Sequence, residues 1–239
     1  MKICLCILTR NEILCLEKTL PFLIEFLKNL QGNCVNTVVA IDGNSTDGTV
    51  DLFKKNHIKV LTQTGVGRGA AFHTAFNQIQ ADAWIFYSPD GNEDITDLPK
   101  FTQALHDGAD LVIASRMSKG AVNEEDINFW KLRKWVNNIF NLCANLFFRR
   151  KGPFVSDSIN GYRAVTKNGV NLLNLDAQDY TIEFQMTIRA LKNGLNIVEF
   201  PTVEGQRIAG DESPSITLGL RFIQCLWREI KIGKNLHNE

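Results

Sequence analysis

The side chains best suited to chemistry lie in one turn, Ser88-Pro89-Asp90-Gly91-Asn92. This turn follows the apolar run 83–87, which is typical of a buried strand. Ligands of open α/β sheets bind at the carboxyl ends of the strands, so the position would bring Asp90 to the ligand-binding edge. A carboxylate there can hold a hard divalent cation, and the cation could carry a phosphorylated substrate. Pro, Asp, Gly and Asn are also the commonest turn formers, so a plain surface turn is the alternative.

Two other loops place acidic side chains after predicted strands. Glu12 follows the strand predicted at 2–8, and Asp42 and Asp47 follow the strand predicted at 35–41. Such carboxylates can accept hydrogen bonds from a nucleobase or from ribose hydroxyls. Phosphates need cations, and three arginines are candidates: Arg68, Arg116 and Arg207. The combination predicts a site for a nucleotide-diphosphate donor whose bond to another group is broken.

Strands and helices alternate along the first half of the chain. Apolar runs predict strands at 2–8, 35–41, 58–61, 83–87 and 110–116. Periodic apolar residues predict helices at 16–30, 50–56 and 98–105. A further helix is predicted to begin at the glycine-rich loop 65–71 and to end at residue 79. This alternation predicts an α/β fold with a mostly parallel central sheet flanked by helices. The second half predicts a helix at 129–148, a turn into a strand at 157–165, a helix at 181–191, a strand at 196–201 and an amphipathic helix at 216–232.

Composition narrows the class of protein. The 239 residues are 44% hydrophobic, which is enough for one sizeable core. Lys and Arg together number 26, as do Asp and Glu, so overall charge gives no reason to expect nucleic acid as a partner. The six cysteines form no C-x-x-C pair and are interpreted as buried thiols in a reducing, cytoplasmic compartment. No apolar stretch approaches the roughly 20 residues that span a bilayer.

A glycine-rich loop precedes the helix that ends at residue 79. Its pattern Gly65-x-Gly67-x-x-Ala70 formally matches the dinucleotide-binding fingerprint. A lone match is weak evidence, and that fingerprint normally follows the first strand of its unit. Glycines that permit a tight turn before a helix explain the pattern equally well, although Arg68 could still reach a phosphate.

Several of these loops carry a resemblance to a known family. They are Thr9-Arg10-Asn11-Glu12, Asp42 to Thr49, Gly65 to Ala71, Ser88-Pro89-Asp90, Ser115-Arg116, Asp157 to Arg163, and Arg207 to Gly210. Together they resemble the family 2 glycosyltransferases of the GT-A (nucleotide-diphospho-sugar transferase) fold, and more narrowly the dolichyl-phosphate mannose synthase-like branch. The resemblance runs across residues 2–213 and implies transfer of a sugar, with inversion, from a GDP- or UDP-sugar to a polyprenyl (dolichyl or undecaprenyl) phosphate. It further implies Mg²⁺ or Mn²⁺ as cofactor and a place in glycan or cell-envelope biosynthesis.

The first three loops imply the donor contacts. The segment from Thr9 through Arg10 to Glu12 is similar to the family's P-x-Y-N-E loop, with Glu12 at the base-contacting acidic position. The loop from Asp42 to Thr49 is similar to D-D-G-S-x-D-x-T, with Gly43 in place of the second acid. This similarity implies that Asp42 is a nucleoside ligand and that Asp47 belongs to the donor site. The glycine-rich loop is similar to N-x-G-x-G-x-A, which implies donor contacts of Gly67 and Arg68.

The metal motif departs from the family pattern. Ser88 stands in place of the first acid of D-x-D, Asp90 keeps the second, and Asn92 falls where a polar metal or sugar ligand is common. The loss of one carboxylate should weaken metal binding, because ligand charge helps to set affinity. Arg116 matches the arginine of G-S-R, and Arg207 would clamp the diphosphate, although the lysine expected after it is missing.

The acceptor remains open between two chemistries. A lipid phosphate is already ionised near pH 7, so the transfer needs positioning and stabilisation of the leaving group but no strong base. A sugar hydroxyl needs a carboxylate to take its proton, and Asp157 is the candidate, with a turn or cap acid as the alternative. Arg133 falls near an arginine that meets the lipid phosphate in the family. A catalytically silent sugar-nucleotide or membrane-binding module is the third hypothesis.

Two helices suit a membrane surface. The predicted helix 129–148 has aromatic residues along its body and basic residues at both ends, as interfacial helices do, and a core or dimer helix is the alternative. In the last helix, Trp227 is flanked by Arg221, Arg228 and Lys231. We therefore expect a peripheral, salt-sensitive contact with the membrane. The expected domains are a glycosyltransferase domain at 1–215, with a nucleotide half at 1–117 and an acceptor half at 118–215, and an amphipathic helix within 216–239.

Overall fold

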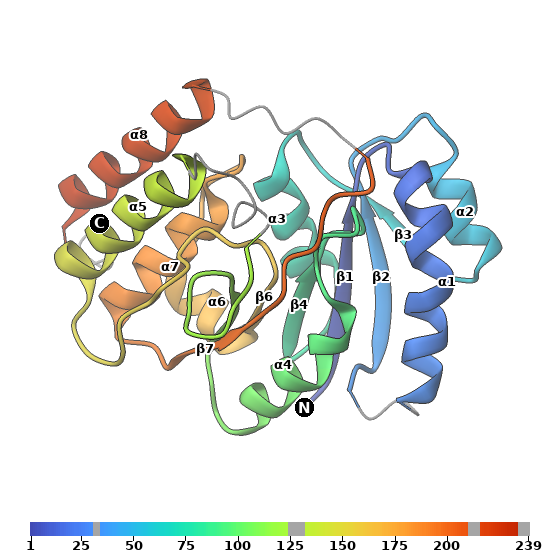
Figure 1. The fold of residues 1–239 in the computed structure, drawn as a ribbon, viewed down its shortest axis with the longest axis horizontal. Helices are drawn as coiled ribbons and strands as arrows, with labels where there is room; N and C mark the ends of the chain where they lie inside the picture. The colour runs from blue at the N-terminus through green and yellow to red at the C-terminus, as the bar shows by residue number, and fades with distance from the viewer. Residues whose placement is uncertain (31–33, 124–131, 210–215, 234–239) are drawn as a thin grey trace.

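The computed structural model describes residues 1–30, 34–123, 132–209 and 216–233 (Figure 1). Within these residues, seven strands form one sheet in the order β3-β2-β1-β4-β6-β5-β7. Their bounds are β1 Ile3–Thr9, β2 Thr37–Asp42, β3 Lys59–Thr62, β4 Ala83–Tyr87, β5 Leu111–Ser115, β6 Arg163–Thr166 and β7 Ile197–Pro201. Neighbouring strands are parallel except at β6, which runs antiparallel to both β4 and β5. The mostly parallel sheet is therefore as predicted, with one reversed strand.

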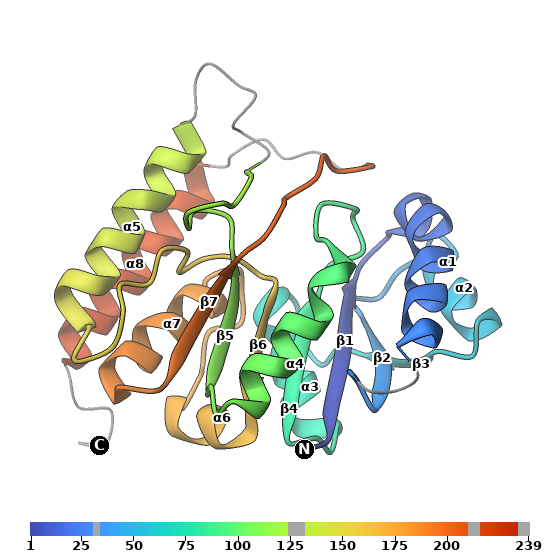
Figure 2. The same ribbon diagram turned by 60° about the horizontal axis from the view of Figure 1, so that its bottom comes forward.

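Helices cover both faces of this sheet (Figure 2). Their bounds are α1 Ile13–Asn29, α2 Thr49–Lys55, α3 Arg68–Gln78, α4 Leu98–His106 after a short 3₁₀ turn at Ile95–Asp97, α5 Leu132–Phe148, α6 Lys167–Leu173, α7 Ile182–Asn193 and α8 Ile216–Ile232. Residues of α1, α2 and α4 pack in one hydrophobic cluster, and residues of α3 and α5 to α8 pack in a second cluster. Strand β1 divides its side chains between the two clusters, because successive residues of a strand point to opposite faces.

Helices α5 and α8 lie side by side in both views and rest on α7, which packs against the sheet (Figures 1 and 2). One aromatic side chain from each helix meets the others: Phe140 of α5, Phe184 of α7 and Phe222 of α8 have ring centroids 5.5 to 5.7 Å apart. Burial of three such rings supplies much of the apolar area that joins the helices. The amphipathic helix predicted at 216–232 is thus part of the folded core on one of its sides.

A buried ionic cluster also joins α8 to α7. The Glu229 carboxylate accepts hydrogen bonds from Lys192 Nζ at 2.7 Å, from Arg189 Nε at 2.9 Å and from Gln185 Nε2 at 3.2 Å. The side chains of Glu229 and Lys192 are fully buried. Burial alone would raise the pKa of Glu229, but the hydrogen bonds from Arg189 and Lys192 hold it below its usual value. Glu229 is therefore ionised in the interior and fixes one end of α8.

The predicted strands and helices are present, with their ends shifted by a few residues. Residues 129–131, the start of the helix predicted at 129–148, lie outside the described residues. So do residues 210–215 and 234–239. Helix α6 was not predicted; it begins after Thr166, whose side chain accepts a hydrogen bond from the Gly169 N–H. The expected division of the chain near residue 117 stays a prediction. No described helix is both long enough and apolar enough to span a bilayer.

Candidate active site

The site is built at the carboxyl ends of β1, β2 and β4. Thr9 and Asp42 are register partners at the last residues of β1 and β2, and the turn after β4 begins beside them at Ser88. β1 and β4 are buried throughout, and the last four residues of β2 are buried, so the strand ends that carry these loops are fixed in the core. The tertiary structure therefore brings together the three acidic loops identified in the sequence.

The loops after β1 and β2 hold each other in place. The hydrogen bonds between them run from Asn11 N to Ser45 Oγ at 2.8 Å, Thr46 N to Asn11 Oδ1 at 2.9 Å, Glu12 N to Thr49 Oγ1 at 3.0 Å, and Ile13 N to Asp47 Oδ2 at 3.0 Å. Asp47 also accepts from Thr49 N, and although burial raises its pKa, these hydrogen bonds hold the pKa below the usual value. The buried Asp42 accepts from the N–H and the hydroxyl of Ser45. Each carboxylate oxygen has a further lone pair for a ligand.

Asp90 and Asn92 are both buried at the turn after β4. Asn92 Oδ1 has no hydrogen-bond partner among the described residues. A buried amide oxygen left in this state is costly unless a ligand completes it, so the position fits a cation or a polar substrate group. Within the described part of the chain, no group of three or more His, Cys, Asp and Glu side chains is placed to hold a metal ion. Asp90 and Asn92 thus fit a metal whose remaining ligands come from the donor phosphates and water.

A segment that follows β7, residues 202–209, crosses the molecule and lies over this turn; we call it the strap (Figure 1). The strap donates from Ile208 N to the Asp90 carbonyl at 3.0 Å and from Gly205 N to the Asn92 carbonyl at 2.8 Å. Gly91 has φ +92° and faces Ile208, and an added Cβ would lie 2.7 Å from the isoleucine side chain. The close packing of strap and turn therefore depends on the glycine between Asp90 and Asn92.

The strap brings Arg207 to the acidic groups. Arg207 Nη1 lies 3.4 Å from Asp90 Oδ2. Burial raises the pKa of Glu12, the charge of Asp90 raises it further, and the charge of Arg207 opposes both effects. Glu12, Asp90 and Arg207 are therefore close enough to influence one another. The predicted role of Arg207 as a clamp for the diphosphate, and that of Asp90 as a metal ligand, stay predictions.

Glu93 is an acidic residue of the site that the sequence analysis did not identify. Its Oε2 accepts a hydrogen bond from Ser88 N at 2.7 Å. Burial, followed by the nearby charge of Asp90, raises the pKa of Glu93 to about 8. Arg68 Nη1 donates to Ser88 Oγ at 3.3 Å, so a guanidinium lies beside the position where the family has its first acid. In the sequence Glu93 is one more polar turn residue, because its burial and its neighbour Arg68 become apparent only in the folded chain.

The glycine-rich loop before α3 is packed against protein. Gly69 N and Ala70 N donate to the carbonyls of Asp179 and Gln178, so these N–H groups at the start of α3 are already used. A Cβ on Gly67 or Gly69 would lie 2.5 or 2.3 Å from backbone carbonyl oxygens of this same segment. The glycines are needed for close approach of two backbones, which favours the turn interpretation over the dinucleotide fingerprint. A donor contact of Gly67 stays a prediction.

Two of the predicted phosphate ligands are engaged by carboxylates. Arg68 Nε donates to Glu183. Arg116 donates from Nε to Asp157 Oδ2 at 2.8 Å, from Nη2 to Asp157 Oδ1 at 3.1 Å and from Nη1 to Glu204 at 3.2 Å. Arg116 therefore fastens the strap, through Glu204, to the loop that holds Asp157. Because acidic side chains already balance both guanidinium groups, they are weaker phosphate ligands than the sequence suggested.

Asp157 is fully buried beneath Arg116. Burial would raise its pKa, but the neighbouring Arg116 guanidinium holds the pKa below the usual range. The Asn160 N–H also donates to Oδ1 at 3.2 Å. A carboxylate in this state is a weak base, so the geometry disfavours Asp157 as the group that deprotonates an acceptor.

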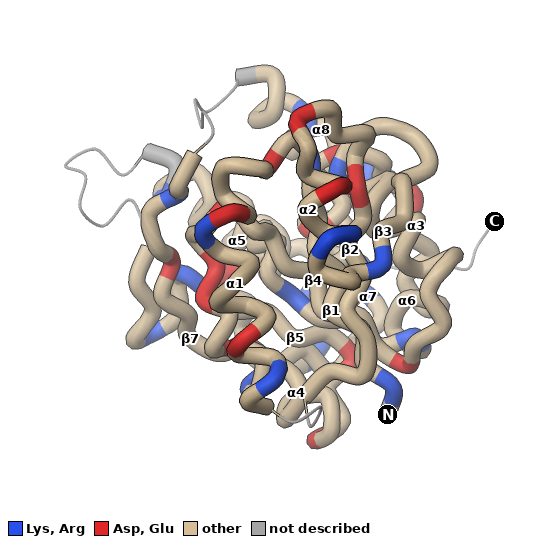
Figure 3. Tube along the Cα trace, turned by 90° about the vertical axis from the view of Figure 1, so that its right-hand side faces the viewer, with Lys and Arg blue, Asp and Glu red and all other residues tan. Residues whose placement is uncertain are grey.

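The remaining candidate residues differ in exposure. Arg10 is exposed, whereas Thr9 is buried and its Oγ1 has no hydrogen-bond partner in the part of the chain that the structure describes. The Arg133 side chain lies outside that part, so its predicted role stays a prediction. Figure 3 shows basic and acidic positions interspersed along the trace on the side of α1 and α2.

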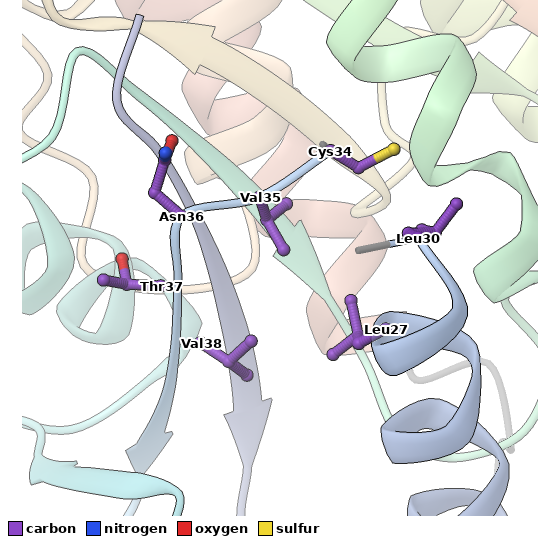
Figure 4. A pocket seen from close by; sticks show the side chains of 7 residues that line it. All are labelled: Leu27, Leu30, Cys34, Val35, Asn36, Thr37 and Val38. Atoms are coloured by element: carbon purple, nitrogen blue, oxygen red, sulfur yellow. The ribbon is translucent and has the colours of Figure 1, made fainter. Parts of the chain in front are cut away.

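A pocket lies away from this site. It is lined by residues at the end of α1 and the start of β2, including Leu27, Cys34 and Thr37 (Figure 4). These residues lie at the amino-terminal edge of β2, whereas the acidic loops lie at its carboxyl end. The lining holds no charged side chain, so this pocket is not the candidate donor site.

Comparisons with known proteins found relatives of this chain in sequence. The sequence profile described as Glycosyl transferase family 2 matches residues 4–166. Glycosyltransferase AglJ of Haloferax volcanii is 31% identical over 206 residues, which are 83% of this chain and 64% of AglJ. Undecaprenyl-phosphate mannosyltransferase of Micrococcus luteus is 26% identical, with 90% of this chain and 88% of that protein covered. Polyprenol monophosphomannose synthase of Mycolicibacterium smegmatis is 27% identical, with coverages of 72% and 68%.

The fold has relatives among solved structures. Glucosyl-3-phosphoglycerate synthase of Mycobacterium tuberculosis, in complex with Mn²⁺ and UDP-glucose, matches with a TM-score of 0.71 at 19% identity. The match covers 95% of this chain and 78% of that one, and it confirms the predicted α/β GT-A fold. The profile match covers more than half of the chain and agrees with the loop motifs. The chain therefore belongs to glycosyltransferase family 2.

Proposed function

We propose that this chain transfers a sugar, with inversion, from a GDP- or UDP-sugar to a polyprenyl phosphate. The observation that carries the proposal is the grouping of Asp90, Asn92 and Arg207 at one turn, since it offers oxygen ligands for a cation beside a guanidinium for a diphosphate. Family membership supports the reaction class. Curated relatives named for undecaprenyl phosphate and polyprenol support the acceptor class.

The donor site would use both sides of this turn. Asp90 and Asn92 would hold Mg²⁺ or Mn²⁺, which when bound neutralises charge that develops on the leaving diphosphate. Arg207 would bind the diphosphate oxygens as a bidentate ligand. Glu12 and Asp42, at the ends of β1 and β2, would accept hydrogen bonds from the base and the ribose, with Thr9, Arg10 and Asp47 nearby. Water exclusion by the strap would strengthen these contacts.

Calorimetric titration with GDP and UDP, each with and without Mn²⁺, tests the donor site. We expect one nucleotide to bind more tightly when Mn²⁺ is present. Transfer of radiolabelled sugar from the matching nucleotide sugar to undecaprenyl phosphate, with a free saccharide as the competing acceptor, then tests the acceptor. Absence of nucleotide binding under every condition would refute the donor site, and transfer to the saccharide alone would refute the lipid acceptor.

The acceptor can also be tested at Asp157. We expect Asp157→Asn to lower turnover by less than about tenfold with a lipid phosphate, because that acceptor needs no base and the variant affects the contacts to Arg116 and Asn160. Loss of a general base costs typically 10²–10⁴-fold. Glu204→Gln is the matched control, since it removes the other carboxylate from the same guanidinium. A loss above a hundredfold for Asp157→Asn alone would favour a hydroxyl acceptor.

A lipid acceptor requires a membrane surface, and we propose that α5 and α8 supply it together. Their outward sides carry apolar residues at helical spacing: Trp135, Ile139, Leu142 and Leu146 on α5, and Leu220, Ile223, Trp227 and Ile230 on α8. Within α5 there is no acidic residue, and the acid of α8 is the buried Glu229. Basic residues such as Arg149, Arg150 and Lys231 are exposed at the ends. This chemistry suits an anionic lipid surface.

Vesicle sedimentation measures this contact. We expect the double variant Trp135→Ala/Trp227→Ala to bind phosphatidylglycerol vesicles about tenfold or more weakly, since burial of a large apolar side chain contributes about 1.5–3 kcal/mol. Trp135 and Trp227 are 70% and 60% exposed, so the fold should tolerate the change. The control is Phe22→Ala, an exposed aromatic residue on α1, across the sheet. Equal binding by all three proteins would contradict the proposed surface.

A further inference from the structure

The ion pair between Arg207 and Asp90 has a consequence for ligand binding. We infer that Arg207 is an internal counterion of Asp90, which the metal ion and the donor diphosphate displace together, so that the metal alone binds weakly. The inference rests on the proposed function, because it takes Asp90 as a metal ligand and a diphosphate as the partner of Arg207. Its starting point is the 3.4 Å separation between Arg207 Nη1 and Asp90 Oδ2.

The backbone of the strap keeps Arg207 at this turn. The residue after it, Ile208, donates to the Asp90 carbonyl at 3.0 Å, and Gly205 donates to the Asn92 carbonyl at 2.8 Å. The Arg207 side chain is 36% exposed, whereas that of Asp90 is only 10% exposed. The backbone on both sides of the arginine is therefore fixed, while its side chain is the more exposed partner of the pair. A ligand can therefore reach the guanidinium from solvent, and a long side chain can exchange one anionic partner for another that lies nearby.

Two acids share the guanidinium. Glu12 is half-buried and lies within the electrostatic reach of both Asp90 and Arg207. Two carboxylates that lie close together repel each other, and the positive charge of Arg207 offsets part of this repulsion in the absence of ligands. A divalent ion at Asp90 would take over this task. It would then lie beside the arginine, so two positive groups would repel each other unless an anion came with the metal.

The donor diphosphate is that anion. It presents several negative oxygens, and a guanidinium binds such oxygens in a bidentate manner. Metal and nucleotide then increase each other's affinity. The metal displaces the Arg207 guanidinium from Asp90, and the guanidinium then binds the diphosphate. Such coupling is reciprocal, so each ligand increases the affinity of the other by the same factor, typically 5- to 150-fold.

Electron paramagnetic resonance of free Mn²⁺ tests the inference on the full chain without nucleotide. We expect Arg207→Gln to bind Mn²⁺ alone at least about fivefold more tightly than the unaltered protein. Fivefold is the lower end of the usual coupling between two binding sites. Binding of UDP or GDP at saturating Mn²⁺ should weaken in the same variant. Arg207→Lys keeps a cation and should leave Mn²⁺ affinity close to that of the unaltered protein. Arg221→Gln, which removes an exposed arginine paired with Asp179, is the matched control.

The outcomes separate this inference from the proposed function. Unchanged or weaker Mn²⁺ binding by Arg207→Gln, in a protein that binds the nucleotide with Mn²⁺, overturns the counterion role alone. Absence of Mn²⁺ binding by every variant, with and without nucleotide, overturns the counterion role and the metal site together. Tighter Mn²⁺ binding by Arg207→Gln, in a protein that transfers no sugar to any acceptor, supports the counterion role and overturns the proposed function.

Discussion

The variant Asp90→Asn is expected to abolish the effect of Mn²⁺ on nucleotide binding. It is also expected to lower sugar transfer by roughly 10²–10³-fold, the usual cost of removing one preorganised electrostatic group. The change keeps the size of the side chain but removes the charge that would hold the metal. It also leaves Arg207 without the carboxylate that lies 3.4 Å away. Calorimetry with UDP and GDP, with and without Mn²⁺, gives the binding effect, and the initial rate of transfer gives the catalytic effect.

The control for this variant is Asp107→Asn. Asp107 is exposed at the end of α4, at the other end of the sheet from the acidic loops, and accepts a hydrogen bond from Gln103 one turn earlier. Its replacement should leave binding and transfer unchanged. Because Asp90 is buried, a thermal melt of each variant is needed to show that both proteins are folded at the assay temperature. Metal-dependent nucleotide binding that survives in Asp90→Asn would refute Asp90 as the metal ligand.

Replacement of Glu229 by glutamine is expected to lower the free energy of unfolding by about 3–5 kcal/mol, the usual cost of removing one partner of a buried ion pair. Lys192 would then keep its charge in the interior without its carboxylate partner, and Arg189 would keep Asp176 as its remaining acid. The lost stability comes from the contact between α7 and α8. Urea unfolding followed by circular dichroism measures it, and binding to anionic vesicles should weaken as well if α8 detaches first.

The effect of Glu229 should depend on pH. The pKa of this carboxyl is lower in the folded protein than its usual value of 4.5. The folded protein therefore binds fewer protons than the unfolded chain, and its stability falls on acidification. The difference between the unaltered protein and Glu229→Gln should be constant well above pH 4.5 and should shrink as pH falls below that value. Glu17→Gln, on the exposed side of α1, should change stability by no more than about 0.5 kcal/mol. A difference that grows on acidification would contradict the ionised state of Glu229.

Much of the fold follows from local patterns. The side chains of β1 alternate between two hydrophobic clusters, and α1 has buried residues at positions 16, 20 and 23, so both elements are predictable from apolar spacing. Strand β6 and helix α6 are harder. β6 has four residues and begins with the buried Arg163, and nothing in its pattern indicates that it runs against both neighbours. Strand direction depends on the path of the whole chain, which a short segment does not encode.

Some features of the candidate site were also predictable from the sequence, and others were not. Asp90, Asp42 and Glu12 were predictable because each follows an apolar strand, and parallel strands present their carboxyl ends at one edge. The partners of Arg116 were not, since Asp157 and Glu204 lie 41 and 88 residues further along the chain. Arg116 and Arg68 appeared to be free phosphate ligands in the sequence, whereas the structure pairs them with acids. The environment of Glu93 likewise depends on distant residues, since Arg68 and Glu204 are among the charges that act on it.

By itself, the sequence determined the alternating strands and helices, the edge of the sheet at which acidic loops meet, and the family to which the chain belongs. These properties depend on side-chain spacing and on loop motifs, which are local. Only the tertiary structure decided which charges are already paired, which carboxylate lies beside Arg207, and that α5 and α8 lie side by side on α7. Those properties depend on burial and on contacts between distant segments, because the energy of a charge is set by what surrounds it after folding.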